Sequence, residues 1–184
     1  ELRMSLHPGP LLKYIIKWTE TMRPIHELLR LSQPDKRMAD VELTIKHLAF
    51  LEDEVQYEGN LKDYIDKIAI LYNGYFDKDW LDKTLTPKLE RLGKAIAAGI
   101  EIFGRDNVCR KYKDGKFEGR FNRAVYDVII GSLHYDDARK WAQDNPALFR
   151  NAFIEVSSAD ADFVNSFETS TKNVAPTTYR FSTW

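Results

Sequence analysis

Hydrophobic residues recur every three or four positions along most of this chain, which is the spacing of one face of an α-helix. The longest such run spans residues 79–103 and ends at Gly104, a residue type that commonly terminates helices. Pro87 lies early in the run, so the helix could begin near Thr86 and carry the proline at its tolerated first position. The run predicts one long helix that faces a core.

The other runs predict shorter helices separated by turn residues. One over residues 37–57 follows Pro34, which blocks upstream extension, and Asp35, which can cap the helix. The remaining runs span residues 11–22, 24–31, 61–75, 121–132, 146–156, 160–167 and 176–184. No segment alternates convincingly as a strand would. The pattern predicts an all-α fold, a single helical domain over residues 1–184, built as an irregular bundle of about seven to eight helices.

Composition supports a folded chain and excludes several classes of protein. Hydrophobic residues make up 43% of the 184 residues, and 27 basic against 28 acidic residues give a net charge of −1, so the whole chain has no bias towards polyanions. A lone cysteine, Cys109, excludes an internal disulfide. No hydrophobic stretch approaches the ~20 residues of a membrane span, and no signal peptide opens the sequence. We expect a cytoplasmic protein with no membrane partner.

Known catalytic signatures are missing from the sequence. There is no G-x-x-x-x-G-K-[ST] or G-x-G-x-x-G for phosphates, and no G-x-S-x-G for a hydrolase serine. The four histidines are scattered and no C-x-x-C occurs, so a zinc site has no support. Cys109 precedes Arg110 and Lys111, which could lower its pKa, but a structural thiol is the favoured interpretation. We therefore assign this chain no catalytic residue, no metal and no cofactor.

Two short polar clusters stand out within predicted helix starts. In the first, Arg37 and Asp40 are i,i+3 neighbours that can pair, and Glu42 faces the lysine four residues on. Its simplest interpretation is a helix start with surface ion pairs. In the second, Asn122 and Asp127 flank core-facing residues and could reach a shared boundary, although Asn122 could equally be a helix N-cap.

A third cluster, over residues 105–123, is basic and contains interleaved aromatic residues. Cations with aromatics on a glycine-containing loop are what a surface needs to bind a nucleic-acid backbone and stack bases. The candidate nucleic-acid residues are Arg110, Lys111, Lys113, Lys116, Arg120 and Arg123. The alternative is a solvated loop between two helices, and the net charge of the whole chain favours it.

Four segments, in order, resemble the C-terminal helical part of the GmrS-type restriction family. The first is Glu1-Leu2-Arg3 with the Pro-Gly-Pro turn that follows, and the second is Asp35 to Leu43, similar to the family's R-M-x-D-x-E-L helix start with a downstream Leu-Ala-Phe. The third is Phe121 to Asp127, and the fourth is Tyr179-Arg180-Phe181-x-x-Trp184. Together they cover nearly the full chain.

The resemblance implies a protein with an N-terminal ParB-like, sulfiredoxin-like half, associated with defence against phage and foreign DNA. In such proteins that half carries a D-G-Q-Q-R motif tied to nucleotide hydrolysis or nucleic-acid cleavage. Neither this motif nor an H-N-H nuclease domain occurs here. The resemblance thus implies that the chain is the C-terminal accessory part of a larger NTPase or nuclease, whose other half would bind nucleotide and a divalent cation.

Polar residues at the matching positions could line the face that meets the ParB-like half. They are Arg3, Arg37, Asp40, Glu42, Asn122, Asp127 and Arg180. Two alternatives remain open. One is a helical protein–protein interaction module without enzymatic role, and the other is a stand-alone nucleic-acid binder.

Overall fold

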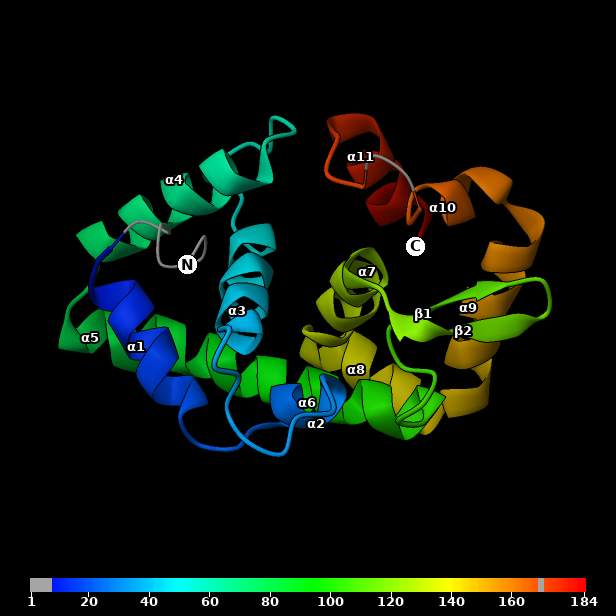
Figure 1. The fold of residues 1–184 in the computed structure, drawn as a ribbon, viewed down its shortest axis with the longest axis horizontal. Helices are drawn as coiled ribbons and strands as arrows, with labels where there is room; N and C mark the ends of the chain where they lie inside the picture. Colours follow the sequence, from blue (N-terminus) through cyan, green and yellow to red (C-terminus); the bar gives the residue numbers. More distant parts are fainter. Residues whose placement is uncertain (1–7, 169–170) are drawn as a thin grey trace. The chain divides into compact units, whose positions relative to one another are not determined.

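The computed structural model describes residues 8–168 and 171–184 of the chain, and these are mostly helical (Figure 1). Arg3, one of the predicted interface residues, lies outside the described residues. Contacts divide the chain into two compact units, Glu1–Gly93 and Lys94–Trp184, with the boundary inside one long helix. The expectation of a single domain stays a prediction, and each unit is described by itself.

The first unit consists of helices packed around an aliphatic core. Its elements are α1 (Pro10–Thr19), α2 (Pro24–Leu28), α3 (Ala39–Phe50), α4 (Leu61–Gly74), α5 (Lys78–Trp80), a π-helix η1 (Leu81–Leu85) and the first part of α6 (Thr86–Phe103). Helices α1, α3 and α4 contact one another pairwise. The hydrophobic stripes predicted from the sequence, with Ile15, Ile45, Ile68, Leu85 and Leu89, lie fully buried where these helices meet.

The π-helix has a local cause in Pro87. Proline has no amide hydrogen, and in a regular α-helix its ring would clash with the carbonyl of the residue four positions earlier. Widening the preceding turn relieves this clash, and the N–H of Thr86 accordingly bonds to the carbonyl of Leu81, five residues back. Helix α6 begins at Thr86 as predicted, but α5 and the π-helix run directly into it, so Pro87 lies inside a continuous helical segment and not at its first position.

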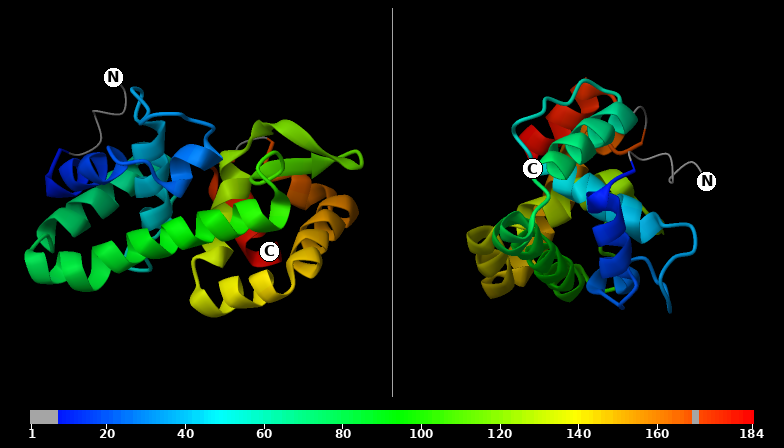
Figure 2. Two further views of the ribbon diagram at one scale, coloured as in Figure 1. Left: turned by 90° about the horizontal axis from the view of Figure 1, so that it is seen from below. Right: turned by 90° about the vertical axis from the view of Figure 1, so that its left-hand side faces the viewer.

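The second unit combines helices with a small β-sheet. After the end of α6 it contains β1 (Arg110–Lys113), β2 (Lys116–Phe121), α7 (Arg123–Leu133), α8 (Asp136–Asp144), α9 (Pro146–Ala159), α10 (Ala161–Asn165) and α11 (Val174–Thr183). Phe153 lies at the centre of its core, 5.9 Å from the ring of Phe103 and 5.6 Å from that of Trp184. The hairpin lies beside α9 and packs against it through β1 (Figure 2).

The hairpin corrects the prediction that the chain is all-α. Antiparallel β1 and β2 pair Tyr112 with Phe117 and Lys113 with Lys116. Asp114 and Gly115 form the two-residue turn with φ values of 52° and 78°, a left-handed conformation that matches the twist of a hairpin. The described residues also contain more helices than the seven to eight expected, because α8 occupies a predicted connection and the predicted run over residues 79–103 is divided into α5, η1 and α6. The coarser prediction of a mainly helical fold is confirmed.

No helix in the described part of the chain is long and apolar enough to cross a membrane.

Candidate nucleic-acid interface

One side of the hairpin packs towards the core of the second unit, and most of the aromatic side chains of the hairpin lie on this side. Tyr112 and Phe117 contact each other edge to face at 5.1 Å, and Phe117 contacts Phe103 of α6 at 6.2 Å. Arg110 is buried on this side, with its guanidinium 5.3 Å from the ring centre of Phe121 and a hydrogen bond to the carbonyl of Val108. The rings of Tyr112 and Phe117 stabilise the hairpin and do not form an open platform for stacking bases, whereas Phe121 also lines the cavity of the hairpin.

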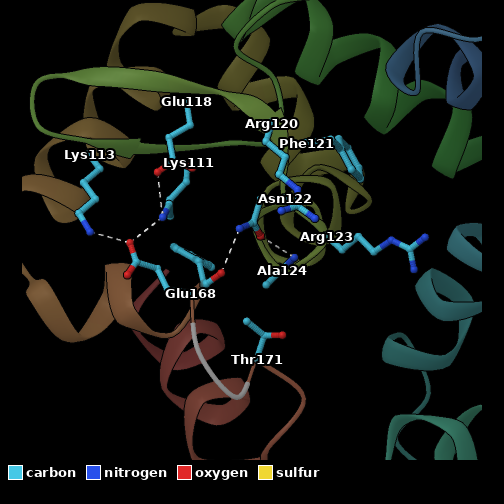
Figure 3. Close-up of a pocket in the computed structure, with 11 residues that line it drawn as sticks. Lys111, Lys113, Glu118, Arg120, Phe121, Asn122, Arg123, Ala124, Glu168 and Thr171 are labelled. Atoms are coloured by element: carbon cyan, nitrogen blue, oxygen red, sulfur yellow. Dashed lines mark hydrogen bonds and ion pairs between the residues drawn. The ribbon is translucent and has the colours of Figure 1, made fainter.

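The other side of the hairpin borders a cavity of about 650 Å³ that is rich in charged residues (Figure 3). Its walls come from both strands, from the start of α7 and from the chain that follows α10. The charged residues that line it are Lys111, Lys113, Glu118, Arg120, Arg123 and Glu168. Four cations against two carboxylates make the lining basic, although the whole chain carries a charge of −1.

Glu168 holds two of the four cations. Its Oε1 accepts hydrogen bonds from Lys111 Nζ at 2.6 Å and from Lys113 Nζ at 2.8 Å, and Lys111 Nζ also lies 2.9 Å from Glu118 Oε1. The hydrogen bonds from Lys111 and Lys113 lower the pKa of the Glu168 carboxyl to about 2. Burial acts to lower the pKa of Lys111, but its hydrogen bonds to Glu168 and Glu118 outweigh burial and raise it. Lys111 is therefore charged and neutralised within the cavity.

The two arginines at the rim differ from these lysines. Arg120 on β2 and Arg123 at the first position of α7 are both exposed. Arg120 has no ion pair with any residue in the described ranges, and Figure 3 shows the Arg123 guanidinium extending away from the pair formed by Lys111 and Glu168. Lys116 is also exposed, next to the hairpin turn. Lys116 and Arg120 can reach an external anion without first breaking a buried contact, and Arg123 is exposed beside them.

Asn122 fixes the geometry between the hairpin and α7. Its Oδ1 accepts the N–H groups of Ala124 at 2.9 Å and Val125 at 3.0 Å, and its Nδ2 donates to the carbonyl of Phe167 at 3.0 Å. The N-cap interpretation of Asn122 is confirmed. The same side chain also fastens the segment that bears Glu168, so one residue positions both the helix start and the carboxylate side of the cavity.

The structure thus separates the six predicted nucleic-acid residues into two groups. Arg110 and Lys111 are buried, at 3% and 8% exposure, and are engaged within the unit. The exposed members are Lys113, Lys116, Arg120 and Arg123. Sequence reasoning missed Glu168, which lies 57 residues from Lys111 and has no local pattern that would assign it to this site.

Asp40, a predicted interface residue, lies buried in the first unit and has a partner that the sequence did not indicate. Its Oδ2 lies 2.9 Å from Nε2 of His26, which is also buried, and its Oδ1 accepts the N–H of Val41. Nδ1 of His26 accepts the N–H of Arg23, so Nε2 carries the proton and donates it to Asp40. Asp40 therefore connects α2 to α3.

Asp35, which was predicted to cap α3, lies three residues before the N-cap, Met38, and binds backbone amides where the helix begins. The Asp35 carboxylate accepts the N–H groups of Arg37 at 2.9 Å and Ala39 at 3.0 Å. The Arg37 side chain is exposed, and Glu42 is half-buried. Among the described interface candidates of the first unit, Arg37 and Glu42 therefore have side chains that reach the surface, whereas Asp40 is buried.

Asp127 and Arg180 are brought together inside the second unit. Both are nearly inaccessible, at 4% and 2% exposure, and Arg180 Nη2 lies 3.8 Å from Asp127 Oδ2. Arg180 also donates to the carbonyl of Ser166, next to the carbonyl that Asn122 binds. This arrangement ties α11 and α7 to the end of α10, which is a structural role.

Other candidate chemistry in the described residues is structural as well. Cys109 is buried, and burial raises the pKa of its thiol, so the neighbouring cations do not activate it. The described residues contain no group of three or more histidine, cysteine or acidic side chains that could hold a metal ion.

Comparison with known proteins adds no assignment. No family model, curated protein or solved structure matches this chain. The resemblance to the GmrS-type family therefore stays a hypothesis that depends on the sequence motifs.

Proposed function

We propose that this chain is the helical accessory part of a GmrS-like, ParB-related defence protein in the cytoplasm, and that it helps that protein to bind DNA. The missing ParB-like half would bind nucleotide and a divalent cation and carry out hydrolysis or cleavage. The chain itself would contact the phosphate backbone through the rim of the hairpin cavity. This function requires no catalytic residue in the chain.

The observation that carries the proposal is the group of exposed cations at the rim. Lys116, Arg120 and Arg123 lie at the turn of the hairpin, at the end of β2 and at the start of α7. Arginine is suited to phosphate because its planar guanidinium donates two parallel hydrogen bonds. Because Tyr112 and Phe117 of the hairpin pack inward, the expected binding is to the backbone and independent of base sequence.

The proposal is tested by measuring DNA affinity of the chain over a series of salt concentrations. Replacing Arg120 and Arg123 together with alanine should weaken binding and make the dependence of log K on log[salt] shallower by about 2 units, one for each lost phosphate contact. The matched control is Lys94→Ala with Lys140→Ala, which removes the same charge from exposed positions on α6 and α8. If both double variants lose the same DNA affinity, the effect depends on net charge alone and the proposal is contradicted.

The family part of the proposal has its own test. The reading frame upstream of Glu1 should encode a strand-rich segment with the D-G-Q-Q-R motif. Joined to that segment, the protein should hydrolyse nucleotide or cleave DNA, and Arg37→Ala should lower this activity without unfolding the first unit, because Arg37 is an exposed residue of the matching motif. If the joined protein is active and insensitive to Arg37→Ala, this surface does not meet the catalytic half.

A second candidate function is a non-enzymatic protein–protein interaction module. The observation that favours it is exposed apolar surface around α8 and α9, where Tyr135, Trp141 and Leu148 are 61%, 52% and 60% exposed. Large exposed apolar side chains mark interaction sites when they lie together. A binding partner lost on Trp141→Ala, with DNA binding absent at every salt concentration, would favour this function over the first.

A further inference from the structure

Two lysines of the hairpin converge on a single carboxylate oxygen. Lys111 Nζ and Lys113 Nζ both donate to Glu168 Oε1, at 2.6 and 2.8 Å (Figure 3). Charge-assisted hydrogen bonds of this length are among the strongest that proteins make. A phosphate of the nucleic-acid backbone presents the same kind of anionic oxygen, so the cluster has the chemistry of a phosphate site that already contains an anion.

The cationic side of this cluster is built into the sheet. Both lysines belong to β1, which pairs with β2, and only 10% of the Lys111 side chain is exposed. Glu118 of β2 is a second partner of Lys111 and holds it from within the hairpin. Lys111 therefore keeps a partner within the hairpin when Glu168 leaves.

The carboxylate side is attached less firmly. Glu168 follows the end of α10, and a quarter of its side chain is exposed to solvent. Its own backbone neighbour, Phe167, is held by Asn122, but the Glu168 carboxylate reaches the lysines only through a flexible side chain. A rotamer change of Glu168 would release Lys113 without moving the backbone of either strand.

We propose that Glu168 occupies a phosphate-binding subsite formed by Lys111 and Lys113, and that a DNA phosphate takes its place when the chain binds. This inference rests on the proposed function, because it assumes that DNA reaches the rim of the cavity through Arg120. It adds the lysines of β1 to the residues that contact DNA, and it makes Glu168 an internal competitor of the DNA phosphate. The low pKa of the Glu168 carboxyl agrees with a strongly positive site.

The size of the effect follows from the ion pairs. When Glu168 leaves, Lys113 becomes available to a phosphate, whereas Lys111 keeps Glu118 as a partner. One additional phosphate contact steepens the salt dependence by about 0.9 and tightens binding at 0.1 M salt by roughly tenfold. Removing the competing carboxylate should therefore strengthen DNA binding, although Glu168 stabilises the free protein.

The experiment compares DNA affinity of the wild-type chain and three variants over a salt series. Glu168→Gln removes the charge but keeps an oxygen that can accept a hydrogen bond, so the fold should persist. Glu168→Asp keeps the charge but shortens the side chain, so the carboxylate cannot reach both lysines. The control, Glu155→Gln, removes an exposed carboxylate from α9 in the same unit. Circular dichroism should be used to check that each variant is folded.

We expect Glu168→Gln and Glu168→Asp both to tighten binding and steepen the salt dependence, with Glu155→Gln close to wild type. If Glu168→Gln and Glu155→Gln tighten binding equally and Glu168→Asp has no effect, only net charge matters and the inference is wrong. If the wild type binds and both Glu168 variants bind more weakly, Glu168 is a structural brace, and the inference fails while the proposed function stands. If no variant binds DNA at any salt concentration, both fail.

Discussion

Replacing Asn122 with alanine should destabilise the second unit by an amount that the structure allows us to work out. The substitution removes the two capping hydrogen bonds from Ala124 and Val125, and the bond to the carbonyl of Phe167. Loss of a helix cap costs about 1 kcal/mol. Loss of a hydrogen bond to a largely buried carbonyl costs about 1 kcal/mol more. The free energy of unfolding of the second unit should therefore fall by about 2 kcal/mol.

Amide hydrogen exchange measures this loss in α7 separately from the first unit. Asn122→Asp divides the two contributions, because aspartate keeps the capping oxygen and loses the N–H donor, so it should lose about 1 kcal/mol. The control is Asn60→Ala, since Asn60 caps α4 of the first unit through Lys62 and Asp63. It should leave exchange in α7 unchanged. A loss below about 0.5 kcal/mol for Asn122→Ala would refute the reasoning, because that is the smallest usual cost of a lost cap.

Three other side chains give further predictions. Asp40→Asn should lower the free energy of unfolding of the first unit by about 2 kcal/mol in urea denaturation, because the buried His26 loses a charged acceptor; the exposed Asp79→Asn should not. Cys109 should react with a thiol reagent only as the second unit opens, and fast labelling of the native protein would contradict this. Folding lowers the Glu168 pKa from 4.5 to about 2, so its contact stabilises above pH 4.5 and is lost as the pH falls towards 2. Exchange in β1 should report that loss, and Glu168→Gln should abolish it.

Local signals in the sequence predicted local structure well. Thr86 is the first residue of α6, as Pro87 indicated, but the chain is already helical upstream in α5 and η1, so the proline changes the type of helix and does not start one. Asn122 was predicted to cap a helix and does so, because capping joins a side chain to amides two or three residues away. Asp35 was also predicted to cap a helix, but the N-cap of α3 is Met38, and Asp35 binds the amide of Ala39 from before the cap. In each case the partners are fixed by chain connectivity.

The hairpin was missed although its signal is present. Asp114-Gly115 between two runs with aromatic residues is the strongest short-range indication of a two-residue hairpin turn. This signal is easily missed, because the hydrophobic residues on both sides have helical spacing and the segment is rich in cations. β1 itself is short, with four residues, of which Tyr112 is the one that is not charged. If the Asp-Gly turn signal is given more weight than the helical spacing of hydrophobic residues, the sequence predicts the hairpin. In a strand, side chains alternate between two faces, so Lys111 and Lys113 are then expected on the same face.

Long-range partners were beyond reach of the sequence alone. The sequence offered Arg37, three residues away, as a partner of Asp40, but it did not indicate the contact with His26, which is 14 residues away on another helix. Glu168 is 57 residues from Lys111, and nothing in either segment points to the other. Which acid neutralises which base depends on packing, because an ion pair in water contributes too little to determine its own geometry.

The count of cations in a segment therefore overstates the positive charge that its surface offers to DNA, and the salt dependence of binding measures the difference. If all six predicted cations contacted phosphates, the slope of log K against log[salt] would be about −5. Arg110 and Lys111 are buried, and Glu168 holds Lys113. The exposed cations that Glu168 does not hold are Lys116, Arg120 and Arg123, so the slope should be about −3. In Glu168→Gln it should move towards −4, as Lys113 joins them. A wild-type slope near −5 would mean that DNA opens the buried pairs, and the closed structure would then not be the one that binds.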